Sequence, residues 1–222
     1  RRHTRLQGDW SSDVCSSDLL LNLLLKIFTL NSGADNNQLE CALSVLAGIF
    51  GYTYDAMMSH LELLLTSFRA YLQQDDLTLR TRTARSLAEI ITYCDKKHLK
   101  HFHEFTFSIL ETTLKCLEAS ISGKDPLKAE TNLKYSLKAI TDISTSHPVL
   151  FKKHFNDLFT LMCKVAETKD FSDENIREIG MEVIVNLVER RNNLFLKDTD
   201  KVKYFVELLF KFALEKIGRA HV

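Results

Sequence analysis

Apolar residues recur every three or four positions from Leu20 onward, the spacing of one face of an α-helix. Clusters of polar residues, glycine and proline interrupt this pattern at intervals, and such clusters end helices. At Pro126 and Pro148 the proline takes the first helical position, where its missing N–H costs no hydrogen bond. The pattern predicts an all-α protein with nine helices, near 20–31, 37–52, 56–73, 77–95, 98–121, 126–146, 148–167, 173–192 and 200–216.

Four of these helices, the second, fourth, sixth and eighth, share one apolar face. When they are aligned on Ala42, Ala84, Ser136 and Gly180, apolar residues follow three, four and seven positions later in each. The aligned residues are 42, 52 and 44 positions apart, and a HEAT or armadillo repeat has roughly 40–47 residues. We therefore predict a HEAT-repeat α-solenoid, a right-handed superhelix of four antiparallel helix pairs followed by an unpartnered ninth helix. The four small residues should be buried against the outer helix of each pair.

The two ends of the chain do not share this pattern. The first nineteen residues show no periodicity, and they include DVCSSD at 13–18. One choice of codons for DVCSSD, read on the opposite strand, encodes IGRAHV, which is the sequence of 217–222. We interpret 1–19 and 217–222 as non-native tails derived from a sequencing adapter. The repeat region is then 20–216, with about four and a half repeats.

Charge and composition restrict the classes of partner. The chain has 29 Lys and Arg against 29 Asp and Glu, and without the two tails its formal charge is −1. No overall field therefore attracts nucleic acid or an anionic membrane. Seven glycines offer little for the loops that cradle phosphates in nucleotide-binding enzymes. Asn22 and Lys26 interrupt the most apolar run, so we expect neither a transmembrane segment nor a secretory signal.

The residues that could carry chemistry do not form a convincing site. His98, His101 and His103 form one cluster, and His98 and His101 share a helical face from which they could bind zinc with Glu104. Three neighbouring lysines favour a solvated turn instead. Cys94 precedes His98 by four residues, but Cys–His catalysis also needs an orienting group and an oxyanion site. We expect a protein that is not an enzyme and has no cofactor or metal. Free thiols, buried in the core, are expected at Cys41, Cys94, Cys116 and Cys163.

Polar residues opposite the apolar face of the aligned helices would line the inner wall of the solenoid. Such residues are often simply solvated, or they form exposed ion pairs between neighbouring repeats. The inner-wall positions are Arg82, Ser86, Glu89, Lys134, Lys138, Glu178, Glu182 and Glu189.

Several segments resemble consecutive HEAT repeats of the importin-β superfamily. They include GIFG at 48–51, LRTRTARSLAEII at 79–91, the run from SLKAITDIS to LFKKHFNDLFTLMCKVAE, and MEVIVNLVE at 181–189. The karyopherin beta-three or importin five branch is the most similar, and the resemblance places the chain inside the amino-terminal half of a longer receptor. It implies a receptor that shuttles between cytoplasm and nucleus, binds Ran-GTP, contacts Phe-Gly nucleoporins with its outer helices and carries cargo through the nuclear pore.

Under this interpretation the inner wall binds cargo proteins that carry basic segments. Carboxylates spaced along adjacent helices can pair with successive Lys and Arg residues of an extended peptide. The candidate cargo-binding residues are Arg82, Glu89, Lys138, Glu178, Glu182 and Glu189.

Two other classes of function remain open. A HEAT-repeat scaffold subunit of a cytosolic complex, such as a phosphatase, kinase or translation assembly, would have the same periodicity. An all-helical enzyme, or a HEAT-like enzyme acting on nucleic acid, would need a basic groove with clustered catalytic residues. The near-neutral charge disfavours the enzyme.

Overall fold

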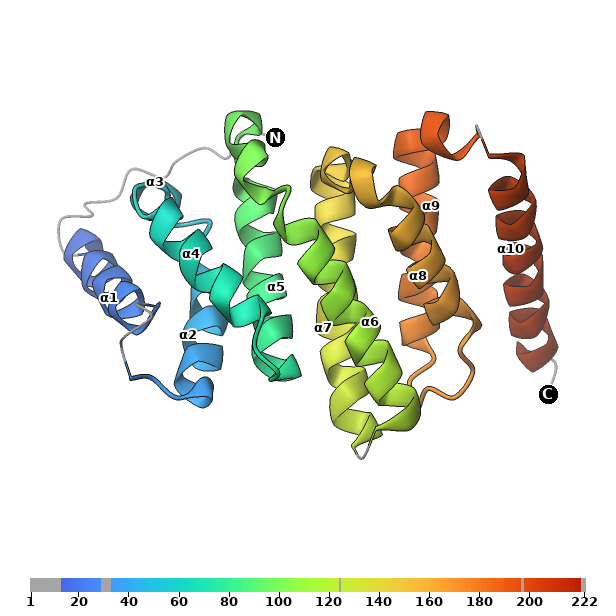
Figure 1. Ribbon diagram of the computed structural model, residues 1–222, viewed down its shortest axis with the longest axis horizontal. Helices are drawn as coiled ribbons and strands as arrows, with labels where there is room; N and C mark the ends of the chain where they lie inside the picture. The colour runs from blue at the N-terminus through green and yellow to red at the C-terminus, as the bar shows by residue number, and fades with distance from the viewer. Residues whose placement is uncertain (1–12, 29–32, 124, 197, 221–222) are drawn as a thin grey trace.

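The computed structural model describes residues 13–28, 33–123, 125–196 and 198–220, and every element within these ranges is helical (Figure 1). The predicted all-α class is therefore confirmed. The elements are α1 (Asp13–Phe28), α2 (Asn36–Ile49), α3 (Tyr54–Met58), α4 (Leu61–Leu72), α5 (Leu77–Tyr93), the 3₁₀ helix η1 (Lys96–Phe102), α6 (Phe105–Ser122), α7 (Pro126–Ser146), the 3₁₀ helix η2 (Pro148–His154), α8 (Phe155–Glu167), α9 (Asn175–Phe195) and α10 (Thr199–Ala220).

The helices form two layers of a solenoid (Figure 1). In one layer α2, α5, α7 and α9 lie side by side, each packed on the next. In the other layer α1, α4, α6 and α8 each pack on the inner helix that follows them in the chain. α10 follows α9 and corresponds to the predicted ninth helix, 200–216, because α3 and α4 together take the place of one predicted helix. This arrangement confirms the predicted antiparallel pairs, because amphipathic helices that cannot bury their apolar stripes alone do so by stacking.

Three outer helices begin differently from the prediction. The predicted helix 56–73 is divided into α3 and α4, while η1 leads into α6 and η2 leads into α8. Proline restricts the residue before it, and His147, before Pro148, has φ −138° and ψ 64°, outside the helical region. A 3₁₀ turn still buries apolar residues three positions apart, as at Leu99 and Phe102. Helical periodicity therefore continues through these segments and hides the break.

The four small residues of the repeat are buried, as predicted. Ser136 forms a hydrogen bond through its hydroxyl with the hydroxyl of Thr113 on its outer helix α6. A Cβ added at Gly180 would lie 3.0 Å from Cγ1 of Val165 and 3.2 Å from the carbonyl oxygen of Met162, both on α8. A small residue is therefore what allows each inner helix to approach its partner.

Aspartate side chains cap the inner helices at one edge of the solenoid. Asp35 accepts a hydrogen bond from the backbone N–H of Gln38 at 2.8 Å, and Asp76 accepts one from Thr78 at 2.8 Å. Asp125 accepts one from Lys128 at 3.0 Å. Because the inner helices are parallel, these caps place negative charge along the edge where the inner helices begin.

Two expectations about individual side chains are wrong. Cys94, Cys116 and Cys163 are buried free thiols, and burial raises the pKa of Cys94 to about 11 and of the other two to about 12, but Cys41 is exposed. Ser86 does not line the inner wall. It is buried and donates a hydrogen bond to the carbonyl oxygen of Leu43 on α2 at 2.8 Å, because α5 packs against helices on both sides.

The helical backbone continues beyond the expected repeat region. α1 begins at Asp13 and α10 ends at Ala220, so parts of both proposed tails are helical. Residues 1–12 and 221–222 lie outside the described part of the chain. The non-native origin of 1–19 and 217–222 stays a prediction.

Candidate functional site

The six predicted cargo-binding residues lie on three consecutive inner helices. Arg82 and Glu89 are on α5, Lys138 is on α7, and three glutamates are on α9. Lys138, Glu182 and Glu189 are exposed to solvent, whereas Arg82, Glu89 and Glu178 are partly buried. All six residues thus lie on inner helices, but their side chains differ in how freely a ligand can reach them.

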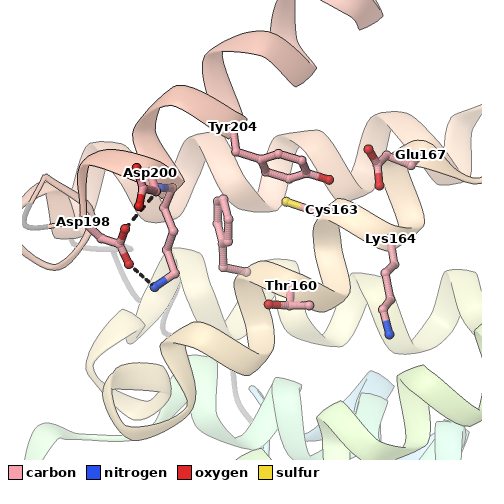
Figure 2. A pocket seen from close by; sticks show the side chains of 9 residues that line it. Thr160, Cys163, Lys164, Glu167, Asp198, Asp200 and Tyr204 are labelled. Carbon is pink, nitrogen blue, oxygen red and sulfur yellow. Dashed lines mark hydrogen bonds and ion pairs between the residues drawn. The ribbon is translucent and has the colours of Figure 1, made fainter.

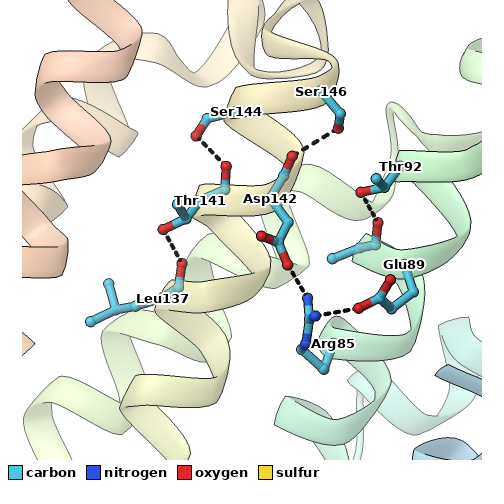
Figure 3. A network of polar contacts seen from close by, with 9 residues as sticks. Arg85, Glu89, Thr92, Leu137, Thr141, Asp142, Ser144 and Ser146 are labelled. Atoms are coloured by element: carbon cyan, nitrogen blue, oxygen red, sulfur yellow. Dashed lines mark hydrogen bonds and ion pairs between the residues drawn. The ribbon is translucent and has the colours of Figure 1, made fainter. Parts of the chain in front are cut away.

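Ion pairs already occupy much of the wall between α5 and α7. Arg85 lies between Glu89 on its own helix and Asp142 on α7, and it donates hydrogen bonds to both carboxylates (Figure 3). The side chain of Arg85 is only 16% exposed. Glu89 is thus already neutralised by a neighbouring cation, which lowers its attraction for a further one.

Arg82 also has a partner across the same helix boundary. Its guanidinium carbon lies 3.9 Å from the centre of the Tyr135 ring on α7, within the range of a cation–π interaction. Arg82 therefore contributes to the packing of α5 against α7. Both side chains of the pair are partly buried.

A further ion pair ties α7 to the segment before α9. The ammonium group of Lys134 forms an ion pair with the carboxylate of Asp173. The hydrogen bond from Lys134, together with one from the backbone N–H of Asn175, lowers the pKa of Asp173. The same two parts of the chain are also joined by Glu130 on α7, whose buried carboxylate accepts hydrogen bonds from the N–H and the hydroxyl of Ser172, at 2.9 and 3.1 Å. The beginning of α9 is thus fixed relative to α7.

Two glutamates of α9, Glu182 and Glu189, are the least compensated of the predicted wall carboxylates. Glu178, Glu182 and Glu189 follow one another at intervals of four and seven residues, so they share one helical face. The ion pairs found in the described part of the chain include neither Glu182 nor Glu189. Within the predicted set, the charge that is accessible to a ligand is concentrated on α9, with Lys138 on α7 as the exposed cation.

The outer layer has a separate cavity of about 580 Å³ between α8 and α10 (Figure 2). The ring of Tyr204 lies beside Cys163 and Glu167, and burial, followed by the hydrogen bond with Glu167, raises the pKa of Tyr204 to about 12. Asp198 and Lys201 form an ion pair at its other end. The sequence pattern did not predict this cavity, since it depends on the angle between two successive outer helices.

The residues considered for metal binding do not meet as that hypothesis required. The rings of His98 and His101 are tilted with their centres 6.3 Å apart, and Glu104 is bound by Arg69. Across the described ranges, no group of three or more His, Cys, Asp or Glu side chains is placed to hold a metal ion. In the same ranges, no helix has the length and apolar character to cross a membrane.

Comparison with known families is decisive for the identity of the repeats. The family profile described as "IPO5-like, TPR repeats" matches residues 21–161, more than half of the chain. The chain belongs to this family, within the importin-β superfamily. The spacing of 42 to 52 residues between the inner helices of this IPO5-like chain exceeds the 34 residues of a TPR and is nearer to that of a HEAT repeat. No curated protein sequence matches the chain.

Solved structures of the karyopherin Kap121p have the same fold as the IPO5-like chain. The structure of Kap121p bound to Nup53p matches with a TM-score of 0.67 and 17% identity over 86% of the chain. The structure bound to Ste12p matches with 0.67 and 17% over 91%, and the structure bound to Pho4p with 0.67 and 17% over 86%. The chain spans only 17 to 18% of the length of Kap121p in these structures. Its neighbours are thus HEAT-repeat karyopherin solenoids.

The sequence pattern assigned Arg82 to the wall, but it did not reveal the partner Tyr135 or the pair of Arg85 and Asp142. Arg85 and Asp142 are 57 positions apart and Arg82 and Tyr135 are 53 apart, so no local pattern relates them. Aligning the repeats on their small residues gives one usable signal. Arg82 precedes Ala84 by two positions and Lys134 precedes Ser136 by two, which marks this position as facing the wall.

Proposed function

We propose that the chain is part of an importin-type nuclear transport receptor, and that its inner helices bind basic segments of protein cargo. The exposed row of carboxylates on α9 carries this proposal. Glu182 and Glu189 are exposed on the helical face that they share with Glu178. An extended peptide with successive Lys or Arg residues can pair with such a row, and weak individual contacts add up along it.

The six candidate residues should contribute unequally to binding a basic peptide, because some of them already have partners. Glu89 contributes less than the α9 glutamates because Arg85 already pairs with it. Lys138 is exposed on α7, which packs against α9, and it would repel a cation, so it favours an acidic residue in the bound segment. Arg82 acts mainly through Tyr135, whose ring it covers.

Cargo and nucleoporins are the partners that the comparisons favour. The related structures hold Kap121p with Nup53p, with Ste12p and with Pho4p. We extend this kind of partner to the present chain by family membership. Ran-GTP binding, passage through the nuclear pore and shuttling between cytoplasm and nucleus belong to the same proposal, and they rest on the family alone. The role is one of binding, without catalysis.

A specific observation favours the outer layer for Phe-Gly nucleoporins. The cavity between α8 and α10 has a volume of about 580 Å³ and includes the ring of Phe159 and the sulfur of Cys163. An aromatic side chain inserted between two outer helices would bury its ring there. Thr160 lines this cavity. Thr160→Trp, which adds a large ring there, should weaken binding of a Phe-Gly peptide while a basic peptide still binds.

Charge reversal on α9 tests the cargo proposal. The variant Glu178→Lys, Glu182→Lys, Glu189→Lys should bind a fluorescent Lys- and Arg-rich peptide at least about tenfold more weakly than the parent chain, because three attractive contacts become repulsive. The parent's affinity should also fall steeply with salt, since the Debye length shrinks to about 3 Å at 1 M. Circular dichroism checks that the variant is folded.

A matched control reverses three exposed carboxylates outside the inner wall. The variant Asp55→Lys, Glu118→Lys, Asp170→Lys has the same change in net charge, and its peptide affinity should stay within about twofold of the parent's. Equal losses in both variants would mean that net charge alone attracts the peptide. An unchanged affinity in the α9 variant would remove the cargo site from α9.

A further inference from the structure

The two edges of the solenoid differ in charge at the two central inner helices, α5 and α7. The edge where the inner helices begin carries the aspartate caps described above. At the other edge, α5 leads into α6 through the segment 94–104, and α7 leads into α8 through the segment 147–154. These segments contain five lysines and five histidines, against Asp95 and Glu104 as acidic residues. The histidine cluster noted in the sequence is therefore part of a basic edge built from two successive repeats.

A cavity of about 550 Å³ opens on this basic edge, between α4, η1 and η2, and we name it the edge pocket. Lys100, His101 and His103 line it from η1 and the turn after it, and Lys153 and His154 line it from η2. The remaining lining comes from α4 and from the residue that precedes α6. Basic side chains of two repeats thus face one cavity.

The acidic groups of the pocket already have partners. Arg69 on α4 donates two hydrogen bonds to one oxygen of Glu104, from Nε at 2.9 Å and from Nη2 at 2.6 Å. Oε1 of Glu62 lies 3.5 Å from Nδ1 of His101. His154 similarly lies 3.5 Å from Asp157 at the beginning of α8. The carboxylates are therefore engaged, each with a basic group.

Three basic groups of the pocket are left uncompensated. In the described part of the chain, no ion pair or side-chain hydrogen bond joins Lys100, His103 or Lys153 to an acidic residue. Lys100 and Lys153 come from different repeats, and all three side chains are exposed. A ligand that pairs with all three basic groups must carry more than one negative charge and several acceptor atoms. It has to contact η1 and the turn after it as well as η2.

The backbone adds to this positive character. α4 and α6 begin at the pocket, and α8 begins directly after His154. None of the three has a side-chain hydrogen bond from its N-cap residue, unlike the aspartate-capped inner helices α2, α5 and α7. The amino-terminal end of a helix is its positive end and favours a phosphate group, which carries a charge near −2 and three acceptor oxygens.

We propose that the edge pocket binds the phosphate group of a phosphorylated serine or threonine in a partner protein, with Lys100 and Lys153 as its main contacts and His103 as a third donor. The exposure of the three side chains favours a segment of a protein chain over a small metabolite, since a small-molecule site usually buries most of its ligand. The edge pocket is lined by α4, η1, the turn after η1 and η2, and by no residue of the inner helices. This proposal is therefore independent of cargo binding on the inner helices.

The test measures fluorescence anisotropy of a phosphoserine peptide with neutral flanking residues and of the same peptide without phosphate, each added to the full chain. The phosphorylated peptide should bind at least about tenfold more tightly. In the variant Lys100→Ala, Lys153→Ala this preference should disappear. The variant Lys96→Ala, Lys152→Ala is the matched control, because it also removes one exposed lysine from η1 and one from η2, but neither residue lines the pocket. It should keep the preference.

Each outcome decides the proposal. Equal binding of the two peptides, or an equal loss of preference in both double-lysine variants, would overturn it in favour of diffuse attraction by the basic edge. Competition by inorganic phosphate at the same concentration as the peptide would assign the pocket to free phosphate and overturn the protein segment as ligand. A Lys- and Arg-rich peptide should bind the Lys100→Ala, Lys153→Ala variant no more weakly than the parent, which separates this result from failure of the cargo proposal.

Discussion

The guanidinium of Arg82 stacks on the ring of Tyr135, 3.9 Å from its centre, and this contact joins two inner helices of successive repeats. Both side chains are partly buried. A double-mutant cycle with Arg82→Ala and Tyr135→Ala, followed by urea unfolding, should give a coupling of about 0.5–1 kcal/mol. Additive effects of the two substitutions would mean that the stacked geometry contributes nothing to the free energy of unfolding.

The close approach of α9 to α8 at Gly180 should distinguish two glycines in inner helices. Gly180→Ala places a Cβ 3.0 Å from Val165, whereas a Cβ at Gly48 in α2 meets nothing within 4 Å. Gly48→Ala should therefore stabilise the protein by about 0.5–1 kcal/mol, since alanine loses less backbone entropy in a helix.

At Gly180 the steric contact should cancel or exceed this gain. Thermal unfolding of the two variants checks the difference. An equal stabilisation by both substitutions would contradict the role of small residues in the repeat.

Stability at acid pH should depend on Glu215. Hydrogen bonds from Lys169, followed by those from Arg177, lower the pKa of this carboxyl to about 2 in the folded chain, against an ordinary value of 4.5. Because the folded pKa lies below the unfolded one, the ion pairs stabilise fully above about pH 4.5, and the stabilisation is lost as the pH falls toward 2. Glu215→Gln should therefore reduce the free energy of unfolding at pH 6 and much less at pH 2. A constant difference across this range would exclude the linkage.

The sequence predicted the layers of this fold better than its contacts. Periodicity located the inner helices and their small residues because both are set by local spacing, and Ala84 and Gly180 are buried as that spacing requires. Ser86 was assigned wrongly to the wall because periodicity describes a helix with one buried face, while α5 packs against four other helices, α2, α4, α6 and α7. The edge pocket needs η1 and η2 side by side, and no pattern within either segment reveals that relationship.

Self-association should arise from the apolar stripe on α10. Phe210 and Leu214 are each 67% exposed, and Val206 and Ile217 extend the same face. Exposed apolar stripes of this kind favour association. Phe210→Glu combined with Leu214→Glu should give a monomer by sedimentation velocity at concentrations where the parent chain forms larger species. A monomeric parent chain would show that the stripe does not mediate association.

A charge-swap experiment tests cargo binding by α9 most directly. It compares a Lys-rich peptide with a Glu-rich peptide of the same length, against the parent chain and the variant Glu178→Lys, Glu182→Lys, Glu189→Lys. If the carboxylate row holds the peptide, the parent should prefer the Lys-rich peptide and the variant should prefer the Glu-rich one, each by at least about tenfold at low salt. If the variant keeps the preference of the parent, the α9 row does not bind cargo and the basic segment is recognised elsewhere.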